Sequence, residues 1–231
     1  MSLLSVCQNA SLVIGLDKPD VIASSTDRPY QELFRLANEM AERISRGHEW
    51  QLFSTVCTLT GNGSLIDFDL PADYDRMVTE ANVWSSALET PLSRVEDIDE
   101  WLGFQVQSFD FVINAWIIFG NEMHIKPAMP TGETAQFFYQ SNLIVKPSGG
   151  SNKARFTADT DTFRLDEQLL ELGIIWQWRA NKGLPYAEDM ASYESLLERL
   201  VSRDKGAKIL RSGRKRVSRG VKIAYPRAIT P

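Results

Sequence analysis

The segment at residues 166–181 constrains the fold most, because apolar residues occupy almost every face of the helix that it predicts. A helix that is apolar all round must be buried by neighbouring elements or by other subunits. Residues 182–185 (Lys-Gly-Leu-Pro) combine a helix stop with a helix start. A second helix is predicted from Tyr186 to about Arg203, with a stripe of apolar residues. The two segments therefore predict an antiparallel helix pair.

A third helix is predicted at residues 28–47. Asp27 is a typical cap residue, and Pro29 lies in the first turn. Apolar residues then recur at helical spacing as far as Ile44, and Gly47 ends the helix. Residues 1–27 are mixed and carry no charge at first, so we expect an extended lead-in that contains at most a short helix.

The chain between these helices is rich in strand signals. Residues 51–60 and 65–70 flank Gly61-Asn62-Gly63-Ser64 and predict a hairpin. Residues 109–119 and 123–126 flank Gly120-Asn121 and predict a second one. Residues 134–146 predict a further strand. Ser93-Arg94-Val95-Glu96 has capping-box spacing, which predicts a short helix at 95–102.

These elements predict an α+β fold: an antiparallel helical bundle core, an inserted β-hairpin or β-sandwich-like region, and an extended C-terminal arm. The expected parts are a lead-in at 1–27, a body at 28–205 and an arm at 206–231. Within the body, helices at 28–47 and 166–205 flank a β-rich region at 51–160.

Charge is segregated along the chain. Residues 203–231 hold ten basic residues and one acid, so this end carries +9, whereas the rest holds 15 basic and 29 acidic residues, or −14. Such asymmetry indicates an acidic body with a basic arm for an acidic partner, either nucleic acid or an acidic protein surface. A solvated terminus is the plainer alternative.

Patterns of catalytic, metal and cofactor sites are missing. Cys7 and Cys57 are isolated, and neither His48 nor His124 has a second ligand at metal-binding spacing. There is no phosphate-binding glycine motif and no GxSxG turn. We therefore predict no catalytic residue, no metal and no cofactor, and an enzyme would need a cluster of ionisable residues that the sequence does not offer. No apolar run reaches about 18 residues, so no membrane contact is expected.

Asp159-Thr160-Asp161 has the beginning of a calcium loop, but the loop pattern fails further on. Its sixth position is Arg164 where glycine is needed, and its twelfth is Leu170 where glutamate is needed. The acids are better explained as turn residues just before a helix N-terminus, where the helix dipole favours negative charge.

Three stretches resemble the head-to-tail adaptor (connector) proteins of tailed bacteriophages, of the short-tailed, podovirus type. The first comprises HEWQLFSTVCTLT (48–60) and FDLPADYDRM (68–77). The second is EDIDEWL (96–102), leading to GNEMHIKPAMPTGETAQFFYQSNLIV (120–145). The third is FTADTDTFRLDEQLLELGIIWQWRANKGLPYAEDMASYESLLER (156–199). The resemblance covers roughly residues 28–205.

The resemblance implies a structural virion protein without catalytic activity. Proteins of this kind form a ring, typically dodecameric, below the portal at the head–tail junction, join the head to the tail nozzle or other tail proteins, and continue the DNA channel through which the genome is retained and ejected. The resemblance also implies that DNA passes without sequence-specific binding, and an acidic body would repel phosphates and let DNA slide. The alternative is a DNA-binding accessory protein that acts through the basic tail.

Two sets of residues are candidates for contacts. The aromatic residues Phe163, Trp176, Trp178 and Tyr186 suit either inter-subunit contacts or the core of this chain. The arm could dock into an acidic portal groove, as the resemblance implies, or touch DNA phosphates. Its apolar residues provide anchors that a tail binding only DNA would not need. The arm candidates are Lys208, Ile209, Leu210, Arg211, Arg214, Lys215, Arg216, Val217, Arg219, Lys222, Tyr225 and Arg227.

Overall fold

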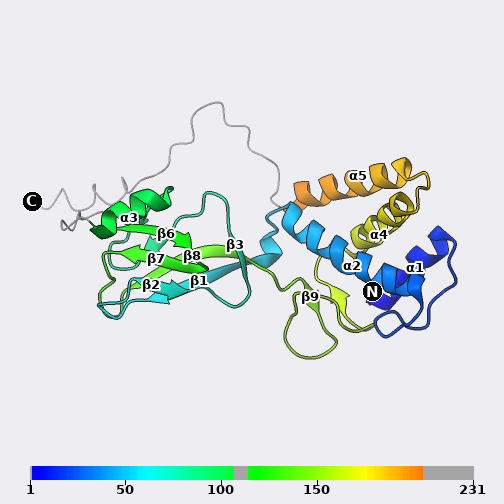
Figure 1. Cartoon of the computed structure of the whole chain (residues 1–231), viewed down its shortest axis with the longest axis horizontal. Coiled ribbons are helices and arrows are strands. Elements are labelled where there is room, and N and C mark those ends of the chain that lie inside the picture. Colours follow the sequence, from blue (N-terminus) through cyan, green and yellow to red (C-terminus); the bar gives the residue numbers. More distant parts are fainter. Residues whose placement is uncertain (1, 107–113, 205–231) are drawn as a thin grey trace, which may run out of the picture. The chain divides into compact units, whose positions relative to one another are not determined.

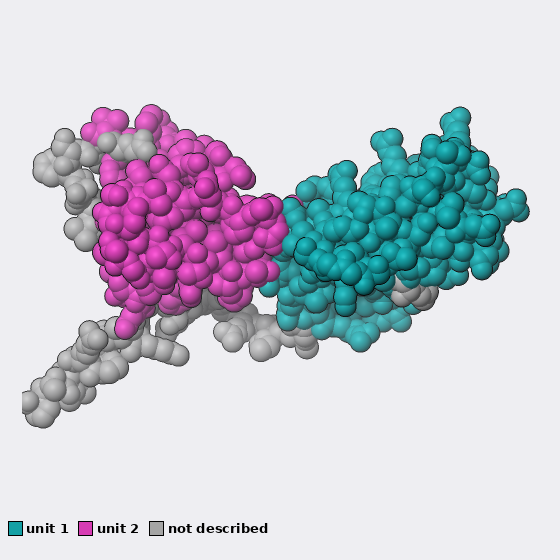
Figure 2. All heavy atoms as spheres, turned by 90° about the horizontal axis from the view of Figure 1, so that it is seen from below, with its two compact units in different colours: residues 1–54, 140–208 teal, residues 55–139, 209–231 magenta. Residues whose placement is uncertain are grey.

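The chain is a mixed α+β protein in a computed structural model that describes residues 2–106 and 114–204 (Figure 1). The described residues divide into two compact units, shown in different colours in Figure 2. Unit 1 takes residues 2–54 and 140–204, and unit 2 takes residues 55–106 and 114–139. The predicted arm at 206–231 lies outside the described residues, so its extended form stays a prediction.

Unit 1 is built mainly from helices around one hydrophobic core (Figure 1). The apolar faces of these helices meet, and a small antiparallel sheet of β9 and β10 adds Val145 and Phe163 to the core. That the helices pack as an antiparallel bundle stays a prediction. The elements are α1 (Leu3–Ile14), α2 (Arg28–Gly47), the 3-10 turn η1 (Gln51–Phe53), β9 (Val145–Lys146), β10 (Thr162–Phe163), α4 (Glu167–Asn181) and α5 (Ala187–Asp204).

The lead-in, expected to be extended with at most a short helix, contains a helix of twelve residues, α1, at 3–14. The Ser2 hydroxyl accepts a hydrogen bond from the Ser5 N–H at the start of α1, and Gly15 ends it with a φ of 79°. Leu3, Val6 and Ala10 are buried in the core. This helix has neither an acid in its first turn nor a base in its last, so its sequence lacks the charged face that marks a surface helix.

The three helices expected from periodicity are present. Asp166 caps α4, since its carboxylate accepts the Leu169 N–H at 3.0 Å. Asp27 occupies the N-cap position of α2 without a side-chain capping bond, and Pro29 lies in the first turn. Between α4 and α5, Gly183 has a φ of 69°, a conformation that suits glycine.

Unit 2 contains two four-stranded sheets. In the β8 sheet, β8 (Thr134–Ser141) lies between β1 (Ser54–Thr60) and β3 (Tyr74–Met77) and also pairs with β4 (Trp84–Ser85). In the β7 sheet the order is β2 (Asp67–Asp69), β7 (Glu122–Lys126), β6 (Ala115–Phe119) and β5 (Ser93–Arg94). One core contains residues of both sheets, among them Phe68, Met123, Ile125 and Phe137. Two sheets that share a core are typical of a β-sandwich-like unit.

The hairpin expected around Gly120-Asn121 is confirmed. β6 and β7 pair antiparallel from Phe119↔Glu122 to Ala115↔Lys126. Both turn residues have positive φ, 62° and 67°, as a two-residue hairpin turn of the primed type requires. Residues 109–113 of the expected hairpin lie outside the described residues.

The hairpin expected from residues 51–60 and 65–70 is wrong, because its two strands belong to different sheets. β1 lies in the β8 sheet, whereas β2 pairs with β7 through Phe68↔Met123. The glycines between them pair with another segment: Gly61 N–H donates to Glu133 O, and Gly63 N–H donates to Met129 O. The glycine-containing segment between β1 and β2 therefore connects a strand of one sheet to a strand of the other.

The helix expected at 95–102 is displaced. Ser93 and Arg94 form β5, which runs parallel to β6, and α3 spans Ile98–Val106. The Ser93 N–H donates to Asn114 O, so the capping-box residues belong to a strand. At the true helix start, the Asp97 carboxylate accepts the Asp99 N–H at 2.9 Å.

Candidate interaction surfaces

The four aromatic residues expected at contacts have different surroundings. Phe163 and Trp178 are each 5% exposed and lie in the core of unit 1. Trp176 is partly buried, with its ring centroid 6.4 Å from that of Tyr186 and with the Arg43 guanidinium 5.8 Å away. Tyr186 is 41% exposed. Phe163 and Trp178 are therefore core residues of this chain. An inter-subunit role of Trp176 and Tyr186 stays a prediction. The predicted arm residues, from Lys208 to Arg227, lie outside the described residues.

A shallow groove of about 370 Å³ in unit 1 lies between α2 and α4. Lys182 Nζ lies 2.6 Å from Glu32 Oε2 and 4.6 Å from the centroid of the Trp178 ring. Hydrogen bonds from Lys182 and Arg28 lower the pKa of Glu32. Glu32 and Lys182 thus form an ion pair with each other, and this pair does not indicate a bound ligand in the groove.

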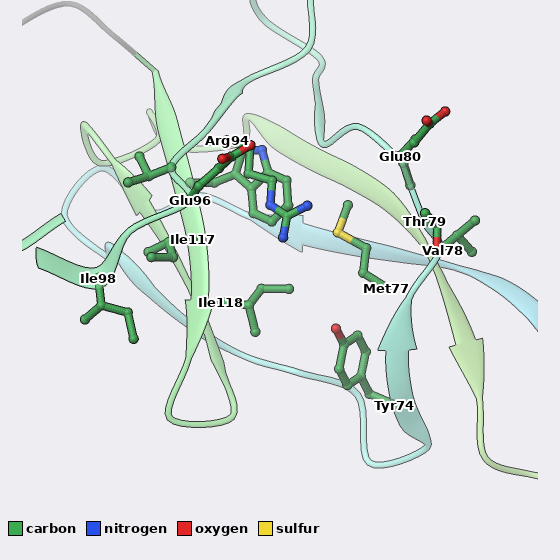
Figure 3. A pocket seen from close by; sticks show the side chains of 13 residues that line it. Tyr74, Met77, Val78, Thr79, Glu80, Arg94, Glu96, Ile98, Ile117 and Ile118 are labelled. Carbon is green, nitrogen blue, oxygen red and sulfur yellow. The ribbon is translucent and has the colours of Figure 1, made fainter. Parts of the chain in front are cut away.

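Unit 2 holds a larger cavity, of about 470 Å³, beside β3, β5 and β6 (Figure 3). Its wall combines apolar and polar groups: Tyr74, Met77 and Ile118 surround the same space in Figure 3, and Glu80 and Glu96 also line it. Arg94 also lines it, with its guanidinium 5.8 Å from the Trp116 ring. Burial raises the pKa of the Tyr74 hydroxyl, so this group is a neutral donor near pH 7. The cavity thus offers both apolar contacts and hydrogen-bonding groups.

One residue of this cavity has a polar atom that is unsatisfied within the described residues. Trp116 is 3% exposed, and its indole Nε1 finds no hydrogen-bond partner in the part of the chain that the structure describes. A buried N–H without an acceptor costs about 1–3 kcal/mol.

The helix next to the cavity presents an unusual outer side. On α3, Ile98, Leu102 and Val106 follow each other at four-residue spacing and are 61%, 53% and 77% exposed. The opposite side of α3 is buried through Trp101, which packs with Ala115 and Ile117 of β6. The acids Glu96, Asp97, Asp99 and Glu100 are exposed beside the stripe. Ile98 and Glu96 also line the cavity, so stripe, acids and cavity are continuous. We call this combination the α3 surface.

The outer face of the β8 sheet is also apolar. Val56, Trp84 and Phe138 are 48%, 50% and 54% exposed, while their neighbours along the strands, such as Cys57 and Phe137, point into the core. Exposed apolar patches on a folded chain typically mark sites of interaction with other proteins.

The histidines and cysteines that the sequence leaves isolated have structural surroundings. His124 Nδ1 lies 2.6 Å from Asp67 Oδ1, and its ring stacks on Phe119 with centroids 3.8 Å apart. Cys7 is fully buried on α1, where burial and then the nearby Asp159 raise the pKa of its thiol to about 12. A thiol with such a pKa is a poor nucleophile. Within residues 2–106 and 114–204, no group of three or more His, Cys, Asp or Glu side chains could hold a metal ion.

The acids of the failed calcium loop bind protein groups. The Asp159 carboxylate accepts the N–H groups of Ile22 and Ala23, at 3.0 and 2.8 Å. Asp161 is 1% exposed and lies 2.7 Å from Lys153 Nζ. Asp159 lies in a turn, as expected, but β10 separates this turn from α4, and both carboxylates bind groups of unit 1 and not the helix N-terminus.

The chain matches the family model of the SU10 adaptor protein over residues 1–221. It belongs to the SU10 adaptor family. This is a family of structural phage proteins and not of enzymes, so the adaptor is a virion component that works by contacting other phage proteins. No curated protein matches the chain. In the described part of the adaptor, no helix has the length and apolar character needed to cross a membrane.

The expected contact residues and the observed surfaces overlap little. The capping-box pattern predicted a helix at 95–102, whereas α3 spans Ile98–Val106. The apolar stripe of α3 was therefore not recognised. The signal was nevertheless present: Ile98, Leu102 and Val106 share one helical face, and four acids lie next to Ile98 in the sequence. The exposed face of the β8 sheet had no comparable signal, because a strand pattern does not say whether its outer side is covered.

Proposed function

We propose that this SU10 adaptor is the head-to-tail adaptor of a short-tailed phage. Copies assemble into a ring, dodecameric in line with the resemblance to connector proteins, below the portal. The ring joins the head to the tail nozzle or other tail proteins and continues the DNA channel, so that the genome is retained and later ejected through it. The observation that carries the proposal is the match to the adaptor family over residues 1–221.

The exposed apolar surfaces support assembly into a ring. A ring needs two different patches on each subunit, because each copy contacts its neighbours through unlike faces. Unit 2 offers the α3 surface and the outer face of the β8 sheet, and unit 1 offers Trp176 with Tyr186. The surplus of acids before residue 203 supports a channel that does not hold DNA phosphates.

The basic arm is proposed to dock into an acidic groove of the portal. Deleting residues 207–231 is expected to abolish binding to the phage's own portal, because the arm holds most of the basic residues after Asp204. The body is expected to stay folded, since the described residues form the cores of both units. Electron microscopy of each protein mixed with portal is the measurement, and circular dichroism is the control. Unchanged portal binding would contradict the role of the arm.

The alternative, a DNA-binding accessory protein, has a different signature. If the arm neutralises about six phosphates, its affinity for arbitrary duplex DNA falls by roughly a thousandfold between 50 and 200 mM salt. A titration of fluorescent duplex at both salt concentrations distinguishes the two functions. Tight binding with this steep dependence favours the accessory protein, and weak binding at both salts favours the adaptor.

A further inference from the structure

The α3 surface has the chemistry of a docking site for an extended basic segment. Glu80 and Glu96 line the cavity, and Asp99 and Glu100 stand exposed on the first turn of α3. The apolar stripe from Ile98 to Val106 continues the cavity wall. The fitting partner therefore carries basic groups for the acids and at least one apolar anchor for the cavity.

Part of the cavity suits an apolar anchor. Arg94 lines the cavity and lies over Trp116, while Glu80 and Glu96 line it as well, so charged groups stand beside the apolar ones. Tyr74, Met77 and Ile118 offer contacts to an aliphatic or aromatic side chain. A cavity of about 470 Å³ has room for such a side chain together with part of its backbone.

One segment of this same chain has that composition. Residues 208–227 carry eight of the basic residues and no acid. Apolar residues are interspersed among them, namely Ile209, Leu210, Val217, Val221, Ile223 and Tyr225. Its charge is thus opposite to that of the α3 surface, and its apolar residues match the stripe and the cavity.

The length of the arm does not limit its reach. The described chain ends at Asp204, and the 23 residues from there to Arg227 span at most about 80 Å when fully extended. A domain of about 100 residues has a radius of gyration near 13 Å. The extended segment is therefore several times longer than that radius, so its candidate site is the α3 surface of its own chain or of a neighbouring copy.

We propose that the α3 surface binds residues 208–227 of this polypeptide before the adaptor meets its portal. The inference rests on the proposed function only in that the same arm later docks elsewhere. Exposed ion pairs are worth about 0–1 kcal/mol each, so this contact is weak enough to be exchanged for a better acidic groove. Tethering keeps the arm at an effective concentration near the millimolar range, which is enough to hold a weak contact closed.

Hydrogen exchange of the full-length protein, without portal or DNA, tests the proposal. The amides of residues 208–227 are expected to exchange about tenfold more slowly than those of a synthetic peptide of the same sequence. In the double variant Glu96→Gln/Glu100→Gln this protection is expected to fall to that of the peptide within about twofold, because two of the facing charges are gone. Asp97 and Asp99 stay in place, so the start of α3 keeps its cap.

Matched variants separate docking from general effects. Glu194→Gln/Glu198→Gln removes the same charge from the exposed side of α5 and is expected to keep the protection. Ile98→Ser/Leu102→Ser is expected to lose it, whereas Leu12→Ser/Val13→Ser, an equally exposed apolar pair on α1, keeps it. Exchange within α3 itself confirms that each variant is folded.

The outcomes decide the proposal. Arm amides that exchange like the peptide in the wild-type protein would overturn it, and so would protection that is equal in all four variants. Protection that survives about a hundredfold dilution assigns the contact to the arm's own chain, and protection that dilution removes assigns it to a neighbouring copy. Failure here leaves the portal experiment untouched, because that experiment measures binding to another protein.

Discussion

A single buried carboxylate holds much of the loop between β9 and β10. Asp161 accepts hydrogen bonds from Lys153 Nζ at 2.7 Å and from the N–H groups of Thr157 and Ala158 at 2.8 and 2.9 Å. Burial raises the pKa of Asp161, but the bonds from Lys153, Thr157 and Ala158 outweigh it and lower the pKa below the ordinary value. The carboxylate is thus a structural anion, although its sequence context resembles the start of a calcium loop.

Replacing this carboxylate is expected to destabilise unit 1. Asp161→Asn removes the charge and one of the two acceptor oxygens while the donors remain, which should lower the free energy of unfolding by about 2 kcal/mol. Chemical denaturation monitored by circular dichroism measures the change. The exposed Asp20→Asn serves as the control, and an equal effect of both variants would contradict this role of Asp161.

The same residue predicts a dependence on pH. Because the folded pKa of Asp161 is lowered, its stabilisation is complete above the unfolded pKa of about 3.9 and is lost as the pH falls through the folded pKa. The difference in unfolding free energy between wild type and Asp161→Asn is therefore expected to shrink below about pH 4. A difference that stays constant from neutral pH to pH 2 would show that the charge does not matter.

At the scale of elements, the chain between β1 and β2 decides how the two sheets of unit 2 connect. Gly61 lies so close to the 129–133 segment that a Cβ added to it would stand 2.6 Å from Met129 O and from Pro130 O. These are backbone atoms, which cannot move without shifting the strand that follows. The glycine is needed here for close approach, since its φ is not positive.

The substitution Gly61→Ala is therefore expected to destabilise unit 2 by about 3 kcal/mol, in the range of overpacked cores. Gly47→Ala is the matched control, because a Cβ on Gly47 meets no atom within 4 Å and that residue lies at the end of α2. Hydrogen exchange in β1 and β8 measures the local effect. If Gly61→Ala left exchange there as slow as in the control, the close approach would be unimportant.

At the scale of the molecule, the two units have separate cores. Among the described residues, the core of unit 1 takes its members from residues 3–53 and 144–201, and those of unit 2 from residues 57–139. The chain leaves unit 1 at Ser54 and returns at Gln140, and Gln140 Nε2 donates to Ser54 Oγ at 2.8 Å. Unit 2 is thus an insertion whose ends lie together.

Removing the insertion is expected to leave unit 1 folded. A variant in which residues 56–138 are replaced by a short Gly/Ser linker should keep the helical circular dichroism of unit 1 and unfold in one cooperative transition, because both properties depend on its own core. The full-length protein is the reference. Loss of cooperative unfolding in the shortened protein would show that unit 1 depends on unit 2.

Local patterns in the sequence were sufficient for several elements and for the α+β class. Periodicity located α2, α4 and α5, and turn chemistry located the β6–β7 hairpin, because both signals depend on residues close together in the chain. The whole-segment resemblance led to the adaptor family, and charge counting separated the acidic body from the basic arm.

The tertiary structure decided which elements meet. β1 pairs with β8, far away in the sequence, and not with the neighbouring β2, because strand partners are chosen by burial of a shared face. Long-range packing also buries α1 and leaves the α3 stripe exposed. It places Ser93 and Arg94 in β5, so that α3 begins only at Ile98. A pattern along the chain shows which face is apolar, but only the folded arrangement shows whether another element covers that face.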